Sequence, residues 1–184
     1  MSKIKNHGII DFNCNDILKL LLMKAKKKLF SEYDEDAYWQ HRQNDLEFTK
    51  KMSGLYNETA RNYHYNYDFS SILPDTFYST TGIKKDPTGI GVFQLLPGKF
   101  TPPHRDRFGT FLTNNPDLEK FPTKFWIPLT RPSIGHALFF EDEVVYNIPE
   151  GTILELPKDA LHSACNAGTE SRIIMTITGV KNGK

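Results

Sequence analysis

The sequence predicts an α+β fold in which a helical N-terminal part precedes a run of short antiparallel strands. The chain has 184 residues, about the size of one domain, since a single core usually serves about 100–200 residues. Between Asp16 and Phe30, apolar residues recur at the spacing of one helical stripe. From Gly89 onward the pattern changes to short alternating or apolar runs separated by turn residues, which is typical of strands.

The N-terminal part is predicted to contain helices and loops. The stripe over residues 16–30 predicts an amphipathic helix, for which Asn13 or Asn15 can serve as the N-cap. A second, weaker helix is expected over residues 35–52. Residues 53–88 are rich in Tyr, Asn, Ser, Thr and Gly, so we expect loops with short strands there.

The C-terminal half is predicted to be all strand. Strand follows strand without an intervening helix, which implies an antiparallel sandwich or barrel. A double-stranded β-helix, or jelly roll, fits best, with the N-terminal helices packed outside one sheet. We expect a single domain in which residues 1–88 are the helical and loop part and residues 89–180 the jelly-roll core. The expected strands are 90–96, 100–104, 125–129, 136–140, 144–146, 152–156, 161–165 and 172–178.

Composition argues against two classes of partner. Lys and Arg total 23 against 22 Asp and Glu, a formal net charge of +1, so the chain lacks a general attraction for nucleic acid or an anionic membrane. No apolar run approaches the roughly 18 residues that span a bilayer, and the first residues lack the apolar stretch of a signal peptide. We therefore expect a soluble cytoplasmic protein that binds small molecules or peptides, with no nucleic-acid or membrane partner. Cys14 and Cys165 lack metal-type spacing and are expected to be free thiols.

A metal-type pattern lies in the C-terminal half. His104 and Asp106 are two positions apart, and in an extended segment residues i and i+2 point to the same side. His162 lies on a later predicted strand, after the turn-rich segment 157–160. Two imidazoles and one carboxylate on one face of a metal leave the opposite positions open, as in the facial triad of non-haem Fe(II) oxygenases. These three residues are the predicted metal ligands.

Arg172 is the predicted anion-binding residue. It follows His162 by ten residues and begins a strand in which Arg172, Ile174 and Thr176 alternate with apolar residues. An arginine inside a small barrel is costly to bury unless it is paired, and its planar guanidinium suits a carboxylate. A dicarboxylate co-substrate would satisfy it.

These residues resemble the pattern of the 2-oxoglutarate- and Fe(II)-dependent dioxygenases: His-x-Asp, a distant His, then Arg about ten residues on. The resemblance covers about residues 90–180 and is greatest to the aspartyl/asparaginyl β-hydroxylase-like group, which includes small free-proline hydroxylases. It implies that His104, Asp106 and His162 hold Fe(II) and that Arg172 binds the far carboxylate of 2-oxoglutarate.

The same resemblance implies the reaction and further cofactor contacts. The enzyme would use O2 to hydroxylate an unactivated C–H bond of an amino acid or peptidyl side chain, releasing succinate and CO2. In that group a basic residue on the strand after the His-x-Asp segment helps to hold the co-substrate, and Lys124 or Trp126 is the nearest match. The segment 107–123 is longer here than in the group, and we expect it to form a mobile lid over the metal.

Three further residues are candidates for the pocket: Gln94, a polar residue in an apolar strand; His136, at the start of a strand; and Thr176, on the face of Arg172. Two other interpretations stay open. The first is a metal cupin enzyme that does not use 2-oxoglutarate, which leaves Arg172 unexplained. The second is a non-catalytic jelly-roll binding or structural protein, in which the His-x-Asp pattern is incidental.

Overall fold

The computed structural model describes residues 4–25, 30–31, 64–65, 72–106, 108–118, 122–141 and 143–183. Its elements are β1 (Lys5–Ile9), α1 (Cys14–Ala25), β2 (Phe30–Ser31), β3 (His64–Tyr65), α4 (Asp75–Thr81), β4 (Ile83–Leu95), β5 (Lys99–His104), α5 (Gly109–Asn114), the short 3-10 helix η2 (Pro116–Leu118), β6 (Pro122–Pro128), β7 (His136–Phe140), β8 (Glu143–Tyr146), β9 (Thr152–Leu156), β10 (His162–Asn166) and β11 (Arg172–Lys181).

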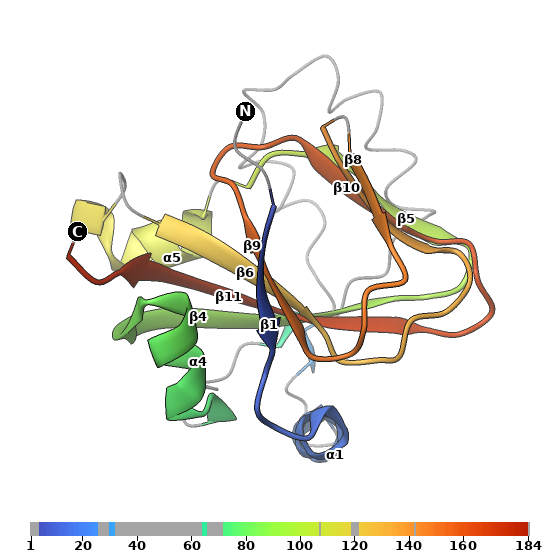
Figure 1. Cartoon of the computed structure of the whole chain (residues 1–184), viewed down its shortest axis with the longest axis horizontal. Helices are drawn as coiled ribbons and strands as arrows, with labels where there is room; N and C mark the ends of the chain where they lie inside the picture. The colour runs from blue at the N-terminus through green and yellow to red at the C-terminus, as the bar shows by residue number, and fades with distance from the viewer. Residues whose placement is uncertain are drawn as a thin grey trace.

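Two antiparallel sheets face each other (Figure 1). The larger has the strand order β1-β9-β6-β11-β4 and the smaller the order β5-β10-β7-β8. From β4 to β11 the chain alternates between the sheets, except that β7 and β8 form a hairpin within the smaller one. This alternation defines a double-stranded β-helix, so the predicted jelly-roll fold is confirmed.

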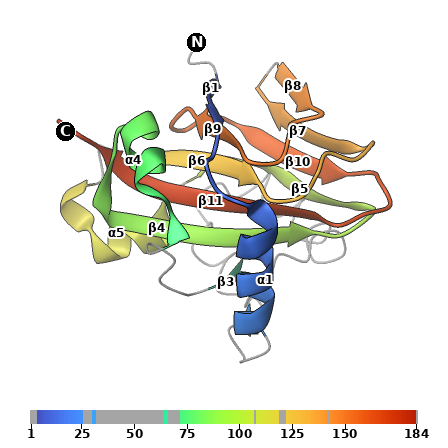
Figure 2. The ribbon, with the colours of Figure 1, turned by 60° about the horizontal axis from the view of Figure 1, so that its bottom comes forward.

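The outer face of the larger sheet is covered by helices. Figure 2 shows α1 and α4 in front of this sheet, on the side away from the smaller sheet (Figure 1). Ile17 of α1 and Phe77 of α4 belong to one buried cluster with Phe125 of β6 and Ile177 of β11. Burial of these side chains fixes the helices against the sheet, as expected from the apolar stripe in the sequence.

The inner faces of the two sheets enclose a second core. It contains Trp126 of β6 and Leu154 of β9 from the larger sheet, and Leu138 and Phe140 of β7 from the smaller one. Alternation along β11 follows the prediction, because Ile174 packs against this inner core whereas Met175 and Ile177 belong to the outer one. Arg172 and Thr176 therefore also face the interior.

The N-terminal part agrees with the prediction at the start of α1 and differs from it at α4. Asn13 caps α1, since its side-chain Oδ1 accepts a hydrogen bond from the Asn15 amide at 3.0 Å. Residues 53–88 are expected to form loops with short strands, but α4 is a helix, so the prediction is wrong for residues 75–81. Strand β4 begins at Ile83, earlier than the strand expected from residue 90. The helix forms because Phe77 and its neighbour Tyr78 are buried against the sheet, which outweighs weak intrinsic helix propensity. The helix expected over residues 35–52 lies outside the described residues.

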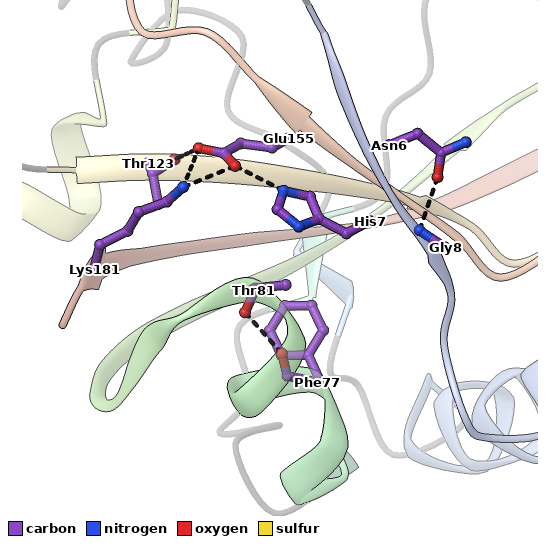
Figure 3. Close-up of polar contacts among 8 residues, drawn as sticks. All are labelled: Asn6, His7, Gly8, Phe77, Thr81, Thr123, Glu155 and Lys181. Atoms are coloured by element: carbon purple, nitrogen blue, oxygen red, sulfur yellow. Dashed lines mark hydrogen bonds and ion pairs between the residues drawn. The ribbon is translucent and has the colours of Figure 1, made fainter.

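The first strand was not anticipated, and it is held by a charged cluster. The Glu155 carboxylate receives hydrogen bonds from His7 of β1 at 2.7 Å, from Lys181 at 2.8 Å and from the Thr123 hydroxyl at 3.3 Å. Figure 3 shows these residues around the carboxylate. The contact from His7 and the backbone pairing of β1 with β9 attach an otherwise exposed strand to the edge of the larger sheet. Among the described residues, no helix is long and apolar enough to cross a membrane.

Candidate metal centre

Two histidines from neighbouring strands of the smaller sheet begin the site. His104 is the last residue of β5 and His162 the first of β10, and the two are Cα partners in the antiparallel pairing. Directly opposed residues on one face lie close together, and the ring centroids here are 4.3 Å apart. The sheet therefore positions both imidazoles.

Asp106 completes the group. Its Oδ1 lies 3.8 Å from His104 Nε2, and its Oδ2 lies 3.5 Å from His162 Nε2. One ligand atom from each of the three residues falls within 4.8 Å of the others. The three predicted ligands thus converge into a group that could hold a metal ion.

The backbone just before His162 orients its ring, a contact that motif spacing alone does not reveal. A neutral His162 that donates Nδ1–H to the Ala160 carbonyl, at 3.0 Å, keeps the lone pair of Nε2 for a metal. The turn also receives a hydrogen bond from the Arg105 guanidinium to the Asp159 carbonyl, which ties it to the segment between the first two ligands. In the sequence, the turn-rich segment 157–160 before His162 was the feature that pointed to such a backbone contact.

The Asp106 carboxylate pairs with Lys124, which reaches it from the opposite sheet. Lys124 Nζ lies 2.8 Å from Asp106 Oδ1, and the two side chains are only 17% and 16% exposed. Burial acts to raise the pKa of Asp106, but Lys124 and the two histidines outweigh it and hold this pKa well below its usual range. The carboxylate is therefore ionised and available to a cation at neutral pH.

Arg172 lies buried between the two sheets. It is 4% exposed, and its Nη1 donates to the carbonyls of Ala137 on β7, at 2.7 Å, and Cys165 on β10, at 3.3 Å. The guanidinium carbon is 4.6 Å from the centroid of the Trp126 ring, a cation–π distance. Burial lowers the pKa of Arg172 to about 10, so the group stays charged at neutral pH. No carboxylate in the described part of the chain forms an ion pair with it.

The remaining candidates divide between the two faces of the sheets. Thr176 is buried on the inner face, where its hydroxyl lies 3.4 Å from the Gly91 carbonyl. His136 is buried at the end of β7 remote from the triad, with Nε2 3.3 Å from the Glu170 carbonyl. Gln94 does not join them, because its Cα partner on β11 is Ile173, which packs on the outer core. Its amide instead donates to the Ser171 hydroxyl.

The long segment after Asp106 contains helical structure. Its described residues form α5 and η2, and α5 ends at Asn114, two residues before Pro116. Phe111 of α5 is buried, and a Cβ on Gly89 would lie 3.5 Å from its ring. Because Gly89 pairs with Thr178, which in turn pairs with Lys124, α5 lies at the triad end of the barrel.

The chain has remote structural similarity to several solved proteins. No protein-family model matches the chain, and no curated protein matches it. One matching structure is a cupin domain from Bordetella pertussis, with 16% identity and a TM-score of 0.37 over 51% of this chain and 81% of that one. Another is the Cnp3 cupin domain of Schizosaccharomyces pombe, with 13% identity and a TM-score of 0.38 over 53% of this chain and 60% of that one. A predicted oxalate decarboxylase from Thermotoga maritima has 11% identity and a TM-score of 0.39 over 65% of this chain and 80% of that one. At such identities these matches carry no information on the reaction, so the evidence for function lies in the site residues.

Proposed function

We propose that this protein is an Fe(II)- and 2-oxoglutarate-dependent dioxygenase that hydroxylates an unactivated C–H bond. The observation that carries the proposal is the state of Arg172: a charged guanidinium, 4% exposed, facing the same barrel interior as Trp126 and Lys124 and lacking a carboxylate partner among the described residues. A buried arginine without an acidic partner is unfavourable in the protein alone. An anionic ligand would remove that cost.

The donor set fits Fe(II). His104, His162 and Asp106 offer two imidazole nitrogens and one carboxylate oxygen, with their ligand atoms within 4.8 Å of one another. This combination is typical of non-haem Fe(II) sites that leave coordination positions open on one side. The hydrogen bond from His162 to the Ala160 carbonyl is the outer contact that such ligands need to keep their orientation.

The interior also fits one end of a dicarboxylate. Two backbone carbonyls occupy Nη1 of Arg172, and a carboxylate would be bound by the remaining N–H groups of the planar guanidinium. Trp126 supports the guanidinium through its ring face, so its expected role in cofactor binding would act through Arg172. Residues of the inner core, including Leu138 and Phe140, would exclude water around the bound acid.

Bound together, Fe(II) and 2-oxoglutarate would supply the oxidising chemistry: O2 is consumed, 2-oxoglutarate loses CO2 to give succinate, and one oxygen atom enters the substrate. The chain's residues bind and orient these groups. For the substrate we propose an amino acid or a peptidyl side chain. A net charge of +1 does not give the chain the excess of basic side chains that binds the phosphates of a nucleic acid.

The decisive experiment measures succinate formed from 2-oxoglutarate by the purified protein with Fe(II) under air. Amino acids, peptides and single-stranded oligonucleotides are added as separate sets, and Asp106→Ala serves as the inactive control. Succinate formation stimulated by amino acids or peptides, and absent from the control, is the expected result. Metal binding without any succinate would favour a cupin that does not use 2-oxoglutarate, and absence of metal binding would favour a non-catalytic jelly roll.

A further inference from the structure

The pairing of Lys124 with Asp106 differs from the role that resemblance gave this lysine. Lys124 is expected to contact the co-substrate, yet its ammonium lies 2.8 Å from a carboxylate oxygen of a proposed metal ligand. The contact joins the two sheets, because Lys124 lies on β6 of the larger sheet whereas Asp106 follows β5 of the smaller one. It is located at the triad itself.

We propose that Lys124 is the built-in counter-ion of Asp106 in the metal-free protein and that it competes with the metal for this carboxylate. This role rests on the proposed metal site, although not on the reaction catalysed there. Asp106 is 16% exposed, and a carboxylate so far removed from water needs a cation or several hydrogen-bond donors. In the metal-free protein, Lys124 supplies that positive charge. A bound metal ion would supply it instead.

The geometry makes the competition direct. Lys124 holds Oδ1, while Oδ2 lies 3.5 Å from His162 Nε2 and Oδ1 lies 3.8 Å from His104 Nε2. A divalent ion bound among these three side chains would share the carboxylate with the ammonium, and two cations at such short range repel each other in a poorly hydrated site. Lys124 therefore stabilises the metal-free protein and weakens metal binding.

A second lysine in the chain provides a matched control. Lys181 pairs with Glu155 at 2.6 and 2.8 Å, with side chains 31% and 12% exposed, and this pair lies on the outer face of the larger sheet. Loss of either lysine removes one partly buried ion pair. Only the loss of Lys124 removes a positive charge from the triad.

The experiment measures Mn(II) affinity by electron paramagnetic resonance of the free ion, together with the melting temperature with and without Mn(II). Lys124→Met and Lys124→Gln should bind Mn(II) at least about tenfold more tightly than the unaltered protein, whereas Lys124→Arg and Lys181→Met should match it. The Lys124→Met variant should also have a lower melting temperature than the unaltered protein without Mn(II), and its melting temperature should rise more when Mn(II) is added. Lys124→Gln keeps a hydrogen-bond donor beside Asp106 and serves if the Met variant fails to fold.

The outcomes separate this inference from the proposed function. Unchanged or weaker Mn(II) binding in both neutral variants, with Mn(II) bound normally by the unaltered protein, overturns the role of Lys124 alone. If those variants instead lose affinity for 2-oxoglutarate, Lys124 is a co-substrate anchor. No Mn(II) binding by the unaltered protein overturns both the inference and the metal site.

Discussion

His104 and His162 stand opposite each other across the β5–β10 pairing, with ring centroids 4.3 Å apart and ring planes at 51°. One residue terminates its strand and the other begins its strand, so the two imidazoles occupy the same end of the smaller sheet. Side chains on paired strands are positioned more accurately than side chains on loops. The sheet itself therefore holds the two imidazoles in place.

Removal of a predicted ligand should abolish metal binding. Asp106→Ala and His162→Ala should each weaken Mn(II) or anaerobic Fe(II) binding by more than about 100-fold, the upper end of the loss seen for outer contacts of metal sites. Calorimetric titration measures this, with His136→Ala as the control because His136 is buried in the interior away from the triad. Undiminished affinity in both ligand variants would contradict the triad.

Arg172 should control affinity for 2-oxoglutarate without controlling the metal. Arg172→Ala should raise the Kd for 2-oxoglutarate by at least about 30-fold, because one partner of a buried charge pair is lost, and should change the Kd for Mn(II) less than about threefold. Arg172→Lys should keep only part of the affinity for 2-oxoglutarate, since an ammonium cannot bind a carboxylate through two parallel hydrogen bonds as a planar guanidinium does. Titration of the Mn(II)-loaded variants tests this, with exposed Arg131→Ala as the control. An unchanged Kd for 2-oxoglutarate would favour the cupin alternative.

The segment 107–123 should close over the site when ligands bind. Its helix α5 lies at the triad end of the barrel, where Phe111 packs over Gly89. Hydrogen exchange of residues 109–118 should slow with Fe(II), 2-oxoglutarate and substrate bound in the absence of O2, because closure removes amides from water. Equal exchange with and without ligands would show that the segment is fixed.

The cluster around Glu155 should make stability depend on acidity. Burial acts to raise the pKa of Glu155, but the hydrogen bonds from Lys181 and His7 outweigh it and lower this pKa below the ordinary value of 4.5. A depressed folded-state pKa contributes stability that is complete above 4.5 and is lost as the pH falls through the folded value. Glu155→Gln should lower the free energy of unfolding at pH 7 by about 1–2 kcal/mol.

Urea unfolding followed at several pH values checks that dependence. The difference between the unaltered protein and Glu155→Gln should shrink as the pH drops below 4.5, since protonation removes the charge that the variant lacks. A difference that stays constant from pH 7 down to strongly acidic solution would show that the cluster contributes packing alone.

The two cysteines should differ sharply towards alkylating reagents. Cys14 is 4% exposed, and burial together with nearby Glu150 raises the pKa of its thiol to about 12, so thiolate is scarce at pH 8. Cys165 is partly exposed, and both cysteines are free. Iodoacetamide labelling followed by peptide mass analysis should modify Cys165 first. Equal rates at both positions would show that α1 opens readily from the sheet.

The sequence alone determined the parts of the site that depend on local geometry. Two-residue alternation placed Arg172, Ile174 and Thr176 on one face of a strand, and β11 has that arrangement because a pleated strand turns alternate side chains to opposite faces. The same rule predicted that the side chains of His104 and Asp106 point to one side of the chain. Most of the jelly-roll strands could be predicted because each is a short apolar run with turn residues at its ends. Turn residues set the backbone conformation of only a few neighbouring positions, so the sequence alone shows where they end a strand.

Only the tertiary structure decided contacts between segments that are distant in the chain. The pairing of Lys124 with Asp106 depends on how β6 of one sheet faces the end of β5 of the other, and nothing local in either segment specifies it. Helix α4 forms because Phe77 is buried in the outer core, although its own sequence has weak helix propensity. Gln94 lies on the outer face because its register with Ile173 is fixed by the whole β4–β11 pairing. Such features follow from register and from packing between sheets, which a single strand cannot determine.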